Sequence, residues 1–274
     1  SALRETLGNL LGPRAGTVLL FPRSDFSSDM LEGLGAAIPN ACVLGAGTVG
    51  GAALVLTAQG EMLRGRAAGL CLLGSAPPLV EFSAACRLLT PLRRIEETAG
   101  GLVLAIDGTP ALDLLSSCVP ELRGAGAGTG APQPVVFAAL AGAEGDDRYV
   151  VRPVRGIDPT RKGVMIGPDA RPGMRVAFAV RDAASAKIGL ENAARTLSQK
   201  ALGAAPRFAL YLSCAGRGQG LYGTADVESR ILRQRFGDLP IAGMHSAFEI
   251  TPWAPGEAKI ALYAGVLALF RSPS

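Results

Sequence analysis

The sequence contains few of the residues from which metal centres, disulfide frameworks and aromatic stacking surfaces are built. Histidine occurs once and cysteine five times in 274 residues, and no two cysteines form a C-x-x-C pair. These counts argue against a zinc site and against a disulfide framework, and the odd number of cysteines fits reduced thiols in the cytoplasm. Aromatic residues make up 5% of the chain, so we expect a core of Leu, Val, Ile and Ala.

Runs of like charge and long apolar runs are also absent. The formal net charge is +4, but acidic and basic residues are interleaved, whereas a nucleic-acid-binding surface needs a clustered basic face with aromatic side chains. No apolar run reaches the roughly 18 residues that suggest a membrane-spanning helix, and the first residues lack the pattern of a signal peptide. We therefore expect a cytoplasmic protein that binds neither nucleic acid nor membranes.

Apolar periodicity predicts alternating helices and strands, which is typical of an α/β or α+β fold. Short apolar strands are expected at 17–21 and 208–213, and helices at 27–38, 111–118, 182–201 and 224–236. Two further strands, at 240–251 and 258–270, are expected to close the chain. A stretch rich in Gly, Ala and Pro at 124–134 has the composition of a linker.

The predicted elements repeat in the same order and type in the two parts of the chain. A strand, a helix and a glycine-containing strand occur near 17–50 and again near 208–248, so that Gly45 would match Gly243 and Thr48 would match Ser246. We predict two related halves, at 1–128 and 129–274. Each half would have a mixed, mainly antiparallel sheet covered by helices, and the preferred arrangement is a four-layer αββα sandwich.

Several short segments resemble the FIST family. Its C-terminal part has a strand ending in Cys-x-Gly-Arg-Gly, then Pro-x-x-Gly and Gly-Glu-Ile, which resemble 213–218 (SCAGRG), 240–243 (PIAG) and 249–250 (EI) here. Residues 107–111 (DGTPA) resemble the family's Asp-Gly-x-Pro-Ala segment, and 45–50 (GAGTVG) its glycine-rich N-terminal strand end. The two halves would accordingly be similar to the FIST N and FIST C parts.

Two features depart from the family pattern. Phe248 stands where the family has the glycine before Glu249, which affects any site that needs a close backbone approach there. The first half also lacks the strand and helix that usually precede it in the family, which indicates a shortened N-terminal part.

The resemblance implies a small-ligand-binding sensory or signal-transduction module, with amino acids or other small carboxylates as ligands and a separate signalling protein or a homo-oligomer as partner. The family also implies two alternatives: a protein-interaction module like that of an F-box relative, and a haem-based gas sensor. A Cys-dependent enzyme is a further alternative from the residues themselves. No cofactor or metal is expected in the preferred interpretation.

The candidate ligand-binding residues gather where predicted strands end, because ligands of α/β folds collect at carboxyl ends of strands. They comprise Cys214, Gly216, Arg217, Gly218, Gly243, His245, Ser246 and Glu249.

Three of these residues leave alternatives open. The Arg217 guanidinium suits a carboxylate ligand, but it could instead pair with Glu249 or Glu228 and hold the loop in place. Glu249 could accept a bond from a ligand amine, form such an ion pair or be an exposed strand residue. His245 could be a haem ligand, a base for Cys214 or a hydrogen-bonding group in a pocket.

Overall fold

The computed structural model describes residues 2–11, 16–48, 50–51, 53–56, 59–74, 76–119, 135–142, 145, 148–203 and 205–271. The chain forms two compact units, of which the first comprises residues 1–85 and 183–274 and the second comprises residues 86–182. The second unit is thus inserted into the first, and these units cut across the expected halves, whose assignment stays a prediction. The expected linker at 124–134 lies outside the described residues.

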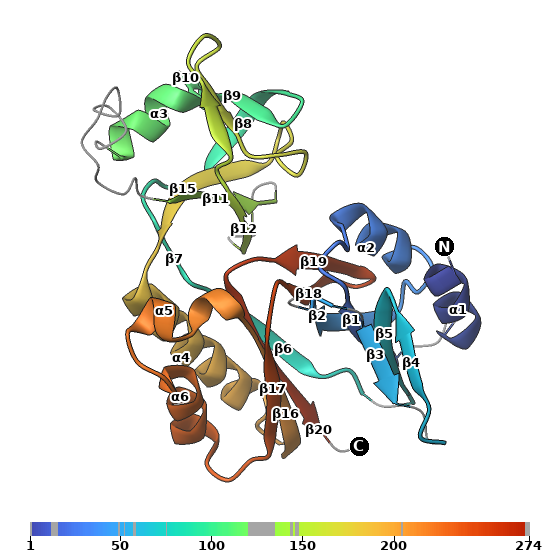
Figure 1. Ribbon diagram of the computed structural model, residues 1–274. Coiled ribbons are helices and arrows are strands. Elements are labelled where there is room, and N and C mark those ends of the chain that lie inside the picture. The colour runs from blue at the N-terminus through green and yellow to red at the C-terminus, as the bar shows by residue number, and fades with distance from the viewer. Residues whose placement is uncertain are drawn as a thin grey trace. The chain divides into compact units, whose positions relative to one another are not determined.

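The first unit contains a five-stranded and a four-stranded sheet, both with parallel and antiparallel neighbours (Figure 1). The order in the five-stranded sheet is β19 (Glu257–Ala261), β18 (Glu249–Ala254), β2 (Ala41–Ala46), β1 (Gly16–Pro22) and β5 (Ala67–Leu73). The order in the four-stranded sheet is β17 (Ile241–Ser246), β16 (Pro206–Cys214), β20 (Ala264–Arg271) and β6 (Leu79–Ala84). A separate hairpin pairs β3 (Ala53–Leu56) with β4 (Met62–Gly65).

The helices of the first unit bury apolar side chains against these sheets. They are α1 (Ala2–Leu11), α2 (Ser28–Gly35), α4 (Ala183–Lys200), α5 (Gln219–Tyr222) and α6 (Val227–Phe236). One apolar cluster joins residues of α1 and α2 to the five-stranded sheet, and another joins residues of α4 and α6 to the four-stranded sheet. Two smaller clusters contain residues of both sheets. The core therefore lies on both faces of each sheet, as the near-continuous apolar strands require.

The two sheets share a pattern of strand pairing. In each, a strand pairs with the parallel strand that follows it through a helix, and with an antiparallel strand on its other side. Leu20 lies opposite Gly45 and Gly69, and Tyr211 lies opposite Gly243 and Leu267. A Cβ on Gly45 or Gly243 would collide with the carbonyl oxygen of the residue opposite, so both positions require glycine.

The second unit is built on a nine-stranded sheet whose centre is strongly apolar. Its strands are β7 (Cys86–Leu88), β8 (Arg93–Ala99), β9 (Leu102–Ile106), β10 (Thr109–Pro110), β11 (Val136–Ala141), β12 (Tyr149–Pro153), β13 (Gly156–Asp158), β14 (Gly163–Met165) and β15 (Arg175–Arg181). All six residues of β11 are buried. Helix α3 (Ala111–Cys118) contacts β9, β10 and β14.

Several predicted elements are confirmed. Helix α3 has the expected bounds and begins directly after Pro110, and the Ser27 hydroxyl caps α2 by accepting a hydrogen bond from the Met30 amide. The mixed α/β character is confirmed as well.

The two closing strands were predicted wrongly as continuous. The first is broken at residues 247–248, where the chain passes from β17 in one sheet to β18 in the other. The second is broken before β20, where Tyr263 adopts a left-handed conformation with φ 54°. Apolar periodicity does not reveal such a change of sheet, because both strands are apolar.

Candidate functional site

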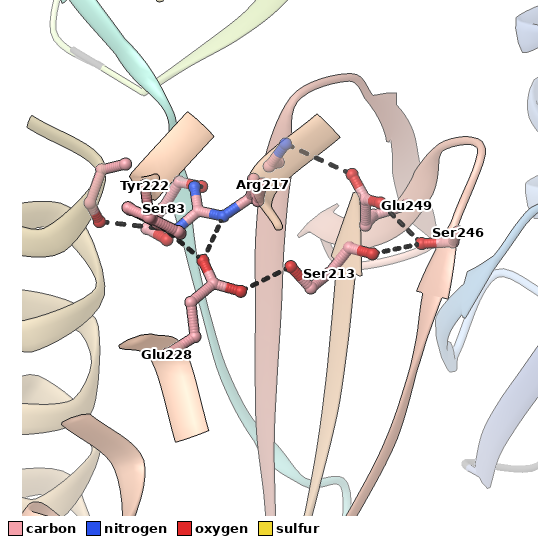
Figure 2. Close-up of polar contacts among 9 residues, drawn as sticks. Ser83, Ser213, Arg217, Tyr222, Glu228, Ser246 and Glu249 are labelled. Atoms are coloured by element: carbon pink, nitrogen blue, oxygen red, sulfur yellow. Dashed lines mark hydrogen bonds and ion pairs between the residues drawn. The ribbon is translucent and has the colours of Figure 1, made fainter. Parts of the chain in front are cut away.

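The segment after β16 is a series of short turns. Strand β16 ends at Cys214, a single 3₁₀ turn covers Ala215–Arg217, and the short helix α5 ends at Gly223 in the left-handed conformation. Asp226 is also left-handed, with φ 61°, directly before α6. These turns reverse the chain, so that the Arg217 side chain points towards Glu228 of α6, as Figure 2 shows.

Arg217 is completely buried. Its Nε donates to Glu228 Oε1 at 2.7 Å, its Nη1 to the Ser83 carbonyl at 3.0 Å and its Nη2 to the Ala186 carbonyl at 3.4 Å. The guanidinium therefore links four segments of the first unit. Of the two glutamates that the sequence left open as partners, Glu228 forms the ion pair.

Glu228 is the centre of this buried cluster (Figure 2). Besides Arg217, its carboxylate accepts hydrogen bonds from the Ser213 hydroxyl at 2.7 Å and the Tyr222 hydroxyl at 2.8 Å. Burial alone would lower the pKa of Arg217, but the nearby Tyr211 and Glu228 offset it, and the pKa is raised above its ordinary value. Arg217 therefore stays cationic, and the buried carboxylate has the counter-ion that burial demands.

Glu249 lies in a second buried cluster, which shares Ser213 with the first. The Ser246 hydroxyl is 2.7 Å from Glu249 Oε1 and 3.1 Å from the Ser213 carbonyl oxygen, and the Ala264 amide donates to Glu249 Oε2 at 3.3 Å. Within the described ranges, Glu249 forms no ion pair with a basic side chain. Burial raises its pKa to about 8, although the bonds from Ser246 and Ala264 oppose the shift.

The proton of Ser246 supports a neutral Glu249. A hydroxyl donates one hydrogen bond, and Ser246 has two acceptors within reach, the Ser213 carbonyl and the Glu249 carboxyl. An ionised Glu249 accepts the Ser246 proton and leaves the Ser213 carbonyl without this donor, whereas a protonated Glu249 can donate to Ser246 and free the Ser246 proton for Ser213. We therefore assign Glu249 as a neutral carboxylic acid at neutral pH.

Cys214 is buried beside these clusters. Burial raises the pKa of its thiol, and Glu249 raises it further once that carboxyl ionises, while hydrogen bonds from the Gly216 and Tyr263 amides lower it only in part. A thiol in this environment is protonated at neutral pH and reacts slowly.

We therefore expect Cys214 to be alkylated by iodoacetamide at neutral pH more slowly than free glutathione, because thiolate is the reacting species. Peptide mapping by mass spectrometry measures each thiol, and the half-buried Cys71 serves as a control in the same chain. If Cys214 were the first thiol to be labelled, the hypothesis of a Cys-dependent enzyme would gain support over the structural role.

A pocket of about 530 Å³ opens beside the Arg217–Glu228 pair. Ser213, Arg217, Tyr222 and Glu228 contribute polar lining. The apolar lining includes Leu232 of α6, Ile241 and Met244 of β17, and Leu239 in the connection between them. Exposed Asp226, Arg233 and His245 also line it. Asp226 makes no side-chain capping bond to α6. The pocket thus combines an apolar wall with exposed groups of both charges, which is the composition of a small-ligand site.

The predicted site residues divide into two groups. Arg217, Gly218, Gly243 and His245 line the pocket. Ser246 and Glu249 lie in the buried cluster described above, and Cys214 and Gly216 also stand outside the pocket lining.

The residues that sequence reasoning missed are Tyr211, Tyr222, Asp226 and Arg233, all of which line the pocket. On α6, the spacing of Glu228 and Leu232 could have indicated which helix face lies at the site. The two residues are one helical turn apart, and both are buried.

Phe248, which replaces the family's glycine, is buried in the core of the first unit. A Cβ on Gly47 would collide with its ring, so Gly47 supplies the space that the larger side chain needs. The departure at Phe248 is therefore accommodated away from the pocket.

Comparison with known proteins gives relatives over most of the chain. An uncharacterized Mycobacterium tuberculosis protein is 27% identical over 263 residues, covering 91% of this chain and 66% of the relative. An uncharacterized Mycobacterium bovis protein is 31% identical over 179 residues, covering 62% of this chain and 45% of the relative. The matches thus span about half to two thirds of the relatives' length. In the described part of the chain, no helix is long and apolar enough to cross a membrane.

The FIST C domain profile matches residues 111–252, which is more than half of the chain. The match includes the strand end at Cys214, the Arg217–Glu228 pair and all of the pocket lining. The chain therefore belongs to the FIST C domain family.

Proposed function

We propose that this chain is a cytoplasmic sensory module that binds a small ligand in the pocket between α6 and β17. The observation that supports it is the pocket itself, about 530 Å³ in volume, with buried polar groups beside an apolar wall. Sites of this kind enclose small molecules and orient them through a few polar groups. FIST C domains are sensory and signalling modules, so a ligand site is what such a module requires.

The ligand class that fits best is an amino acid or another small carboxylate. The donors of Arg217 already bond to Glu228, Ser83 and Ala186, so this guanidinium is not the preferred anchor. Arg233 is exposed and lines the same pocket, and Asp226 supplies a carboxylate without a capping bond. We assign Arg233 to the ligand carboxylate and Asp226 to an amine.

A thermal-shift screen with amino acids and other small acids tests this proposal. A ligand at about 100 times its Kd stabilises a protein by roughly 2.7 kcal/mol, so the melting temperature should rise for the correct class and less for Arg233→Gln. Arg195→Gln is the matched control, because Arg195 is exposed on α4 and lies outside the pocket lining. If no compound in these classes raised the melting temperature, the proposed ligand class would be wrong.

Signal output would pass through a separate signalling protein or a homo-oligomer.

We also propose that the first unit is a four-layer αββα sandwich made of two repeated parts. The shared pattern of strand pairing supports the repeat, as does the requirement for glycine at both Gly45 and Gly243. The clusters that contain residues of both sheets support the layering.

A further inference from the structure

The proposed repeat has an exact register. The residues opposite Leu20 are Gly45 and Gly69, and those opposite Tyr211 are Gly243 and Leu267. The number of positions from Gly45 to Gly243 equals the number from Gly69 to Leu267. The segment from β2 to β5 therefore corresponds, residue by residue, to the segment from β17 to β20.

This correspondence identifies the counterpart of each intervening strand. The same shift carries β3 into the range of β18 (Glu249–Ala254), and β18 follows β17 as β3 follows β2. Strand β18 does not stay in the sheet of β17. It crosses to the other sheet and pairs antiparallel with β2, with Glu249 opposite Ala46 and Ile250 opposite Gly45.

The repeat predicts a matching crossing in which β3 leaves the sheet of β2 and pairs with β17, but the structure does not form it. Strand β3 pairs with β4, and among the described strands the outer edge of β17 pairs with nothing. Both surfaces are apolar and exposed: Leu54, Val55, Met62 and Leu63 on the hairpin, and Ile241 and Met244 on β17. An exposed sheet edge and an exposed apolar hairpin are both surfaces that proteins normally cover.

We propose that the edge of β17 is the docking surface for the β3–β4 hairpin of the same chain. In the docked form, β3 pairs antiparallel with β17 as β18 pairs with β2. The register that follows places Ala53 opposite Ala242 and Leu54 opposite Ile241. Docking adds a strand to the four-stranded sheet and covers the apolar side chains of both partners.

The docked hairpin also changes the pocket. Residues 241–245 of β17 line it and are exposed, so a strand added at this edge orders the β17 wall and covers that side. Gly50 and Gly51, with φ values of 75° and 78°, lie just before the hairpin and supply backbone freedom that other residues lack. The docking follows from strand register, so it does not depend on the nature of the ligand.

Paired cysteines test the docking and its register. We would make Ala53→Cys with Ala242→Cys, and separately Leu54→Cys with Ile241→Cys, and oxidise each protein with copper phenanthroline. Adjacent pairs of an antiparallel ladder alternate between hydrogen-bonded and non-hydrogen-bonded types, so at least one pair should form a disulfide readily. The mismatched control is Leu70→Cys with Ile241→Cys, because Leu70 is exposed on β5.

The expected result is an intramolecular disulfide in one matched pair, formed at least tenfold faster than in the mismatched pair, with peptide mapping to exclude the native cysteines. Disulfides that form only between molecules would assign the surface to a second copy and overturn docking within one chain. Equal rates in matched and mismatched pairs would overturn the docking altogether. Thermal unfolding of the reduced variants confirms folding, and ligand binding is measured separately.

Discussion

Replacing Arg217 with alanine is expected to lower the free energy of unfolding by about 3 to 5 kcal/mol, because it leaves Glu228 as a buried charge without its counter-ion. Arg217 is completely buried and is 2.7 Å from Glu228 Oε1. The substitution also removes the hydrogen bonds that Arg217 donates to the Ser83 and Ala186 carbonyls. Chemical denaturation monitored by circular dichroism measures the loss.

Two further variants show whether the loss comes from the buried pair. Arg161→Ala removes an exposed pair with Asp158 and should cost less than about 1 kcal/mol. Adding Glu228→Gln to Arg217→Ala should recover part of the stability, because the unpaired charge is then removed. A loss from Arg217→Ala as small as that from Arg161→Ala would show that the cluster does not hold the loop.

Replacing Glu249 with glutamine is expected to remove a pH dependence of stability. The pKa of Glu249 is raised from its ordinary value of 4.5 to about 8 in the folded protein by burial. Between these values the folded state binds a proton that the unfolded state has lost, so stability falls as pH rises. The slope for one such group is about 1.4 kcal/mol per pH unit. Glutamine keeps a donor towards Ser246 and does not titrate.

The measurement is the free energy of unfolding of both proteins from about pH 5 to about pH 9, across the window that the two pKa values define. The wild type should lose stability relative to Glu249→Gln up to about pH 8 and then level off. Glu257→Gln is a control for an exposed carboxylate. Parallel curves for wild type and Glu249→Gln would mean that Glu249 is ionised in the folded state and that burial does not raise its pKa.

Sequence reasoning predicted the local elements of this chain well. The predicted helices at 27–38 and 111–118 correspond to α2 and α3, because the Ser27 cap and Pro110 act through short-range backbone geometry. The strand end at Cys214 and the glycine-rich turn after it were identified for the same reason. The requirement for glycine at Gly243 depends instead on the strand beside it, and it was suggested by the match to Gly45 and by the family's Pro-x-x-Gly pattern.

Longer-range features could not be predicted in the same way. The choice between Glu228 and Glu249 as the partner of Arg217 depends on which sheet each following strand joins, and β18 joins the other sheet. The sequence pattern also did not reveal that the second unit is inserted at residue 86, because the strands on both sides of this boundary are apolar. The sequence did not identify Asp226 and Arg233 as pocket residues, because it is the chain reversal after α5 that brings them to the pocket.

We propose that the buried Arg217 holds the loop in place while the exposed charges of the pocket bind the ligand. Isothermal titration calorimetry with the most stabilising compound of the thermal-shift screen tests it most directly, on wild type, Arg233→Gln and Arg195→Gln. We predict that Arg233→Gln weakens binding at least tenfold, or about 1.4 kcal/mol, and that Arg195→Gln leaves the affinity unchanged. Equal affinities of wild type and Arg233→Gln would contradict the claim.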